Sequence, residues 1–64
     1  MIRVNGTDDD YMNETVAELL VRRDVAQRGI AVALNGEVVR RSEWATTRIP
    51  DAAFIEIVTA AAGG

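Results

Sequence analysis

The group in this sequence best suited to chemistry is the α-carboxylate of Gly64, which is ionised at neutral pH and follows a run of small residues. The side chains offer little else, because the sequence has no cysteine and no histidine and its seven basic residues are all arginine. A thiolate, an imidazole base and a lysine for a Schiff base are therefore missing. We expect no catalytic side chain, no metal site and no bound cofactor, and so a chain that is not an enzyme in its own right.

Residues 59–64 are expected to form a flexible tail that carries this carboxylate. Six extended residues reach up to about 20 Å, and Gly63 and Gly64 have no Cβ atom. Ala62, Gly63 and Gly64 can therefore thread into a narrow site on a partner protein. The alternative is an inert, frayed terminus, which small residues at a chain end often form. The tail residues alone leave both interpretations open.

Two Asn-Gly pairs predict hairpins in the body of the chain, since this dipeptide readily supplies the positive φ angles of a tight turn. Asn5-Gly6 follows the alternating segment 2–4, and we expect a return strand near residues 8–12 that forms a solvated acidic edge. Asn35-Gly36 joins the apolar segment 30–34 to a second short return strand.

A helix is predicted between the two hairpins. Thr15 and Glu18 have the spacing of a capping box, in which each side chain accepts a hydrogen bond from the other residue's backbone N–H group. The helix should end before Gly29, which suits the left-handed conformation of a C-terminal cap. Apolar residues at spacings of three and four predict the buried stripe: Val16, Leu19 and Leu20.

The last predicted strand, residues 54–58, has two apolar faces. Ile55 and Ile57 lie on one face, which we expect to meet the helix. Phe54 and Val58 lie on the opposite face, where they would form an exposed apolar patch for docking to partner proteins. The alternative is that loops cover this second face.

The order of hairpin, helix, hairpin and strand predicts an α+β fold, a mixed sheet of four to five strands with one main helix on one face. Residues 1–58 would form this domain and residues 59–64 the tail. Between the second hairpin and the last strand, residues 42–44 are expected to make an irregular turn that places Trp44 in the core.

Charge and hydropathy restrict the partners. The net charge of −3 and the sequence pI near 4.7 argue against nucleic acid and favour a protein partner with a basic surface. No apolar run approaches the roughly 20 residues of a membrane span. The sequence opens on Met1-Ile2-Arg3-Val4 without a basic and apolar leader, so we expect a cytoplasmic protein that does not bind a membrane.

The sequence resembles the ThiS sulfur carriers of thiamin biosynthesis, which have the β-grasp fold of ubiquitin. The resemblance extends over essentially the whole chain and rests on the combination of its segments. The similar segments include the helix start, the second hairpin, the turn after it, the last strand and the end of the tail. They are residues 15–20, 30–39, 41–44, 55–58 and 63–64.

The resemblance implies a mechanism that depends on other proteins. A ubiquitin-activating-type adenylating enzyme, similar to ThiF or MoeB, would use ATP and magnesium to adenylate the Gly64 carboxylate. Sulfur originating from cysteine, supplied by a cysteine desulfurase or a sulfurtransferase, would then displace AMP and leave a thiocarboxylate. That thiocarboxylate would donate its sulfur to thiazole synthase (ThiG).

Three positions depart from the family pattern. Ala52-Ala53 stands where the family commonly has Gly-Asp, and alanine has a steric cost at any positive φ that glycine avoids. Arg40 replaces a common proline, and the segment 8–10 is unusually acidic.

Three other functions remain open. A molybdopterin-type sulfur carrier would use the same chemistry with another acceptor. A ubiquitin-like protein modifier would join Gly64 to lysines of target proteins. A plain interaction domain would have an inert tail.

Overall fold

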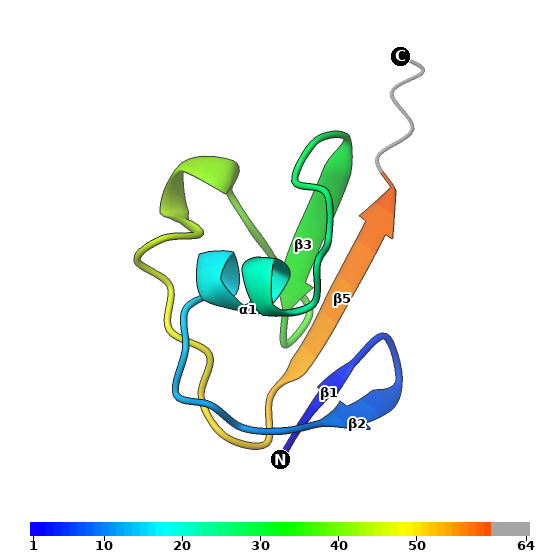
Figure 1. The fold of residues 1–64 in the computed structure, drawn as a ribbon, viewed down its shortest axis with the longest axis vertical. Coiled ribbons are helices and arrows are strands. Elements are labelled where there is room, and N and C mark those ends of the chain that lie inside the picture. The colour runs from blue at the N-terminus through cyan, green and yellow to red at the C-terminus, as the bar shows by residue number, and fades with distance from the viewer. Residues whose placement is uncertain (60–64) are drawn as a thin grey trace.

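The computed structural model describes residues 1–59 and contains the two hairpins, the helix and the last strand (Figure 1). Its elements in chain order are β1 (Ile2–Val4), β2 (Thr7–Asp9), α1 (Val16–Arg22), β3 (Ile30–Leu34), β4 (Glu37–Val39), the 3-10 helix η1 (Arg41–Glu43) and β5 (Phe54–Thr59).

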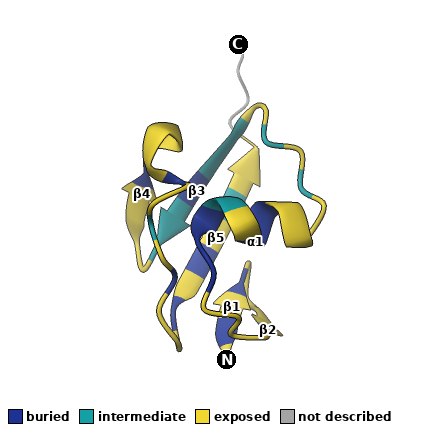
Figure 2. Ribbon diagram, turned by 60° about the vertical axis from the view of Figure 1, so that its left-hand side comes forward, coloured by how far each residue is buried: buried dark blue, intermediate teal, exposed yellow. Residues whose placement is uncertain are grey.

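The five strands form one mixed sheet in the order β2-β1-β5-β3-β4, so the last strand lies in the middle. β5 runs parallel to β1 and antiparallel to β3, while β1 with β2 and β3 with β4 are antiparallel hairpins. α1 crosses one face of the sheet (Figures 1 and 2). The predicted α+β fold, a mixed sheet with one main helix on one face, is confirmed with five strands.

Both hairpins turn through an Asn-Gly pair, as predicted. Asn5 and Gly6 have φ angles of 52° and 80°, the two positive values of a type I′ turn. Asn35-Gly36 repeats this turn with φ angles of 51° and 85°. The predicted return strand is present, but the predicted bounds near residues 8–12 were too late, because a two-residue turn leads directly into β2, which covers Thr7–Asp9.

The helix begins where the capping box predicts. The Thr15 hydroxyl oxygen accepts a hydrogen bond from the Glu18 backbone N–H group at 3.2 Å. The Glu18 carboxylate in turn accepts one from the Thr15 backbone N–H group at 2.8 Å. Both otherwise unpaired donors at the helix start are satisfied in this way.

The helix ends earlier than predicted, because Asp24 rather than Gly29 provides the left-handed cap. Asp24 has a φ angle of 55° and follows the last helical turn directly. The Val25 N–H group donates to the Leu20 carbonyl oxygen at 2.9 Å, which closes a Schellman motif. Gly29, with a φ angle of 67°, precedes β3 instead.

The core lies between α1 and the sheet face that the helix covers. Trp44 belongs to it, as predicted: it is 4% exposed, and its Nε1–H group donates to the Val39 carbonyl oxygen at 2.9 Å. Ile49, which no sequence pattern indicated, is 2% exposed. The other buried apolar residues are Ile2, Val4, Val16, Leu19, Leu20, Val32, Val39, Ala53 and Ile55.

An ion-pair network joins the first hairpin to the helix. The Arg22 guanidinium group donates to both oxygens of Glu14, at 2.7 to 3.1 Å, and to Asp9 at 3.2 Å. Arg23 adds a hydrogen bond to Asp9 at 2.6 Å. The hydrogen bond from Arg22, followed by one from a backbone N–H group, lowers the pKa of Asp9 from 3.8 to about 2. The expectation of a merely solvated acidic edge was therefore wrong for Asp9.

The turn before β5 contains the departure from the family pattern at Ala52. Its φ angle is 66°, so an alanine occupies the left-handed region that glycine prefers. Its N–H group donates to the Met1 carbonyl oxygen at 3.0 Å, and the next carbonyl, that of Ala53, accepts from the Arg3 N–H group at 2.9 Å. The turn thus connects β1 to the start of β5 and holds Ala52 in this conformation.

Candidate functional site

The described structure ends at the last residue of β5, Thr59, which pairs with Ile30 of β3. The predicted tail residues Ala62, Gly63 and Gly64 lie outside the described residues. β5 extends one residue beyond the predicted strand, so Thr59, which we expected to begin the tail, belongs to the sheet.

The two faces of β5 differ as its alternating pattern indicates. Ile55 on the helix side is 1% exposed, and Ile57 is half-buried against the core. Phe54 and Val58 on the opposite side are 58% and 56% exposed, so no loop of residues 1–59 covers them. Figure 2 shows this alternation of buried and exposed positions along β5.

A third exposed apolar side chain, Val38 of β4, lies on the same face. The strand register places Ala33 beside both Val38 and Glu56, and it places Ala31 beside Val58. Val38 is 75% exposed, whereas the two alanines between it and β5 are half-buried. The sequence analysis did not identify Val38 as a site residue. Consecutive strand residues point to opposite faces, so Val38 must face outward once Val39 faces the core.

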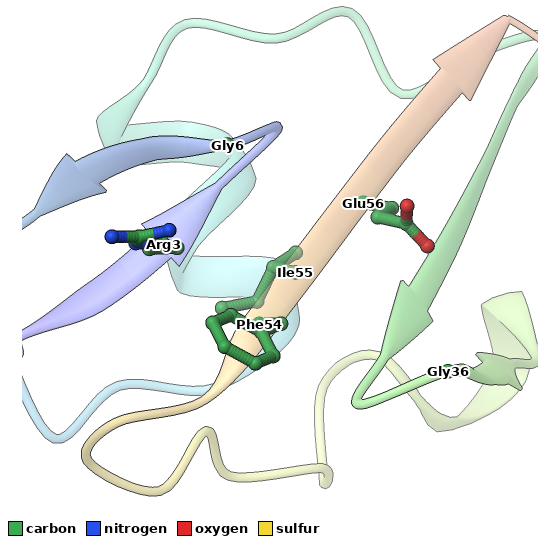
Figure 3. A pocket seen from close by; sticks show the side chains of 6 residues that line it. All are labelled: Arg3, Gly6, Gly36, Phe54, Ile55 and Glu56. Carbon is green, nitrogen blue, oxygen red and sulfur yellow. The ribbon is translucent and has the colours of Figure 1, made fainter.

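A shallow pocket lies at the start of β5 around Phe54 (Figure 3). The Phe54 ring and Arg3 project from neighbouring strands, which the parallel register places side by side. The Arg3 Nε–H group donates to Asp8 at 3.1 Å, and both side chains are exposed. The lining residues are Arg3, Gly6, Gly36, Phe54, Ile55 and Glu56.

Three exposed apolar residues lie on this face and are called the open-face patch below: Phe54 and Val58 of β5, and Val38 of β4. Phe54 is the first residue of this strand and Val58 the next to last. At about 3.3 Å per residue, their Cα atoms are roughly 13 Å apart. Val58 thus lies near the start of the predicted tail, and Phe54 lies at the opposite end of the strand.

The chemistry available to the described residues is limited. Within residues 1–59, no three acidic side chains are gathered as they would be to hold a metal ion. The described helix is too short to cross a membrane. The arrangement provides a surface with one polar network and one apolar patch, which suits contact with another protein.

A mixed five-stranded sheet with parallel β1 and β5 at its centre and one helix across a single face defines the ubiquitin-like β-grasp class. The chain belongs to the ThiS family, whose family model matches residues 2–64.

Individual relatives agree with this assignment. The sulfur carrier protein ThiS of Escherichia coli (strain K12) is 39% identical over 51 residues, which cover 80% of this chain and 77% of the relative. The crystal structure of the thiamine biosynthesis protein ThiS from Geobacter metallireducens superposes with a TM-score of 0.83, at 34% identity over 98% of this chain and 97% of the other. The solution structure of a thiamine biosynthesis protein from the same organism gives a TM-score of 0.73, at 36% identity over 98% and 86% of the two chains.

Proposed function

We propose that this chain is the sulfur carrier of thiamine biosynthesis and acts through the Gly64 carboxylate. A separate adenylating enzyme, ThiF-like or MoeB-like, joins this carboxylate to AMP with ATP and magnesium, and pyrophosphate leaves. Sulfur derived from cysteine, carried as a persulfide by a cysteine desulfurase or a sulfurtransferase, then attacks the acyl carbon and displaces AMP. A thiol reductant cleaves the S–S bond of the resulting acyl disulfide, which leaves the thiocarboxylate. The resulting thiocarboxylate donates its sulfur to thiazole synthase.

The observation that carries this proposal is the family match over residues 2–64, because it includes Gly63 and Gly64 as well as the domain. The relative from E. coli is named sulfur carrier protein ThiS, which supports the same role. The order of activation follows from chemistry, since a carboxylate oxygen leaves poorly and adenylate leaves well. In this proposal, the domain extends through Thr59, and the residues after it present the reacting group through Ala62, Gly63 and Gly64.

The open-face patch is the proposed docking surface for the partner enzymes. Phe54 and Val58 are more than half exposed, and Val38 extends the same apolar surface to β4. Burial of these aromatic and aliphatic side chains against a partner would remove apolar area from water, which favours binding. Docking through the patch would hold β5, and hence the residues that follow it, against the activating enzyme.

Intact-mass measurement tests the reaction. The full chain would be incubated with its ThiF-like partner, a cysteine desulfurase, cysteine as the sulfur source, a thiol reductant, ATP and magnesium. We expect a species heavier by one exchange of oxygen for sulfur, and a chain without Gly64 should not form it. Covalent adducts with lysines of other proteins would instead identify a protein modifier, and an unmodified mass with a competent enzyme present would overturn the proposal.

Two matched substitutions test the docking surface. Val58→Ser removes apolar area from the patch, while Val21→Ser makes the same chemical change at a 70% exposed position on the helix. Burying the exposed half of a valine contributes on the order of 1 kcal/mol, so Val58→Ser should raise the KM of the adenylating enzyme for the carrier roughly 5-fold. Val21→Ser should leave KM unchanged, and an equal effect of both changes would refute docking through this face.

A further inference from the structure

The side chain of Asn5 completes the hydrogen bonding of β5 where its neighbour β1 has already ended. The β1–β5 ladder pairs only Arg3 with Phe54 and Val4 with Ile55. On its other side, β5 remains paired with β3 up to Thr59. The backbone groups of β5 that face β1 would therefore lose their partners after Ile55.

Asn5 supplies the missing partners for Ile57. Its Oδ1 atom accepts from the Ile57 N–H group at 2.8 Å, and its Nδ2 group donates to the Ile57 carbonyl oxygen at 3.2 Å. Its own backbone N–H group donates to the Ile55 carbonyl oxygen at 2.9 Å. A carboxamide has the same donor and acceptor as a peptide group, so this side chain extends the ladder by one residue.

The turn geometry makes this contact available. Asn5 occupies a position with positive φ, which asparagine tolerates better than most residues with a side chain. The side chain can therefore reach across to β5 while the main chain already turns back into β2. Ile57, the residue that it binds, lies two positions before the end of the described chain at Thr59.

We propose that Asn5 is a positioning residue for the reaction of the carrier: it holds the end of β5 straight and so sets the direction in which the C-terminal residues leave the sheet. This inference rests on the proposed function, because direction matters only if Gly64 must meet an active site. The open-face patch would bring the carrier to its partner, and Asn5 would orient the carboxylate once it is there. Small errors in such placement lower reaction rates strongly.

The second Asn-Gly turn provides a matched control. Asn35 also has a positive φ, and its Oδ1 atom accepts from the Phe54 N–H group at 2.9 Å. Its side chain therefore also accepts a backbone hydrogen bond from β5, but at the first residue of the strand. Asn5→Gly and Asn35→Gly both keep a residue that accepts positive φ in the turn. Both also remove the side-chain hydrogen bonding to β5.

The experiment measures the rate of ATP–pyrophosphate exchange by the ThiF-like enzyme of the same organism. The concentration of the carrier, used as the whole chain, is raised until the rate saturates. Asn5→Gly should lower kcat about 10-fold with KM nearly unchanged, because docking is kept and placement is lost. A merely destabilised carrier would instead lower the folded fraction, which raises the apparent KM and leaves kcat unchanged. Asn35→Gly should keep kcat within about 2-fold of the unsubstituted chain.

A second variant covers the case in which Asn5→Gly folds poorly. Asn5→Asp keeps the acceptor and the tolerance of positive φ but loses the donor to the Ile57 carbonyl oxygen, and it should also lower kcat. Equal kcat values for the unsubstituted chain, both Asn5 variants and Asn35→Gly would overturn the role of Asn5 alone. An unsubstituted chain that supports no exchange would overturn the proposed function, and the role of Asn5 with it.

Discussion

Replacing Ala52 with glycine should stabilise this domain. Ala52 has a φ angle of 66°, and a side chain in the left-handed region costs roughly 1–2 kcal/mol. Glycine removes that cost but adds freedom to the unfolded chain, which offsets about 0.5–1 kcal/mol. The net gain lies between about 0 and 1.5 kcal/mol, and its midpoint of about 0.75 kcal/mol corresponds to an increase in Tm of roughly 3–6 °C for a domain of this size.

The hydrogen bonds of the turn explain why Ala52 does not relax out of this conformation. Its N–H group donates to the Met1 carbonyl oxygen at 3.0 Å and to the Asp51 carboxylate at 2.8 Å. A rotation to negative φ would break these contacts between the turn and β1. The alanine therefore retains its steric cost, and glycine can recover it without a change in the fold.

Ala45→Gly is the matched control for this prediction. Ala45 is exposed in the turn after η1 and is not among the described residues with positive φ. The same substitution there should lower the free energy of unfolding by about 0.5–1 kcal/mol. Urea and thermal unfolding, followed by circular dichroism, would measure both variants. Shifts of the same sign and size at both positions would refute the reasoning from φ.

Further predictions concern the ion-pair network, pH and Trp44. Asp9→Asn should lower the free energy of unfolding at pH 7 by about 1–2 kcal/mol, since it removes the charged partner of Arg22; urea unfolding that changes by less than about 0.5 kcal/mol would contradict this. Because the pKa of Asp9 falls from 3.8 to about 2 on folding, its contribution is complete above pH 4 and disappears as the pH falls through 2. The unsubstituted chain should lose stability more steeply than Asp9→Asn across that range, and parallel pH profiles would show that this pKa is not lowered. Trp44→Phe should cost about 2–3 kcal/mol, because it leaves the Val39 carbonyl oxygen without its donor and opens space in the core, and an unchanged melting temperature would count against a buried indole hydrogen bond.

Local signals in the sequence predicted the elements that depend on neighbouring residues. The two Asn-Gly pairs fixed both turns, and the capping box of Thr15 and Glu18 fixed the start of the helix. Strand alternation separated Phe54 from Ile55 and so predicted which side chains would be exposed. Each of these features is decided within about four residues, where steric and hydrogen-bonding rules are strong.

Features that depend on distant residues were not predictable in the same way. The end of the helix was placed too late because glycine is the usual left-handed cap, whereas Asp24 takes this role with Val25 packed against the core. Arg22 of the helix binds Asp9 of β2, a pair that no local pattern indicates. Ile49 is buried in a segment with no periodic pattern, and its N–H group donates to the carbonyl oxygen of Glu14, which is distant in the sequence.

The candidate site was predictable in part. Its apolar face on β5 followed from the sequence, while Val38 required the register of β4 against β3. The contact of Asn5 with Ile57 spans 52 positions, so no local pattern could reveal it. The interpretation of the tail rests on residues outside the described structure and on the family to which the chain belongs.

The central position of β5 also has a consequence for biosynthesis. The ribosome makes this strand after all the others, yet without it the two hairpins share no hydrogen-bonded edge. While Thr59 is still inside the ribosomal exit tunnel, the nascent chain has two separate hairpins whose apolar side chains face water. The domain must therefore fold after β5 has left the tunnel. A product truncated within β5 has no completed sheet, so its apolar side chains remain exposed and open to proteolysis.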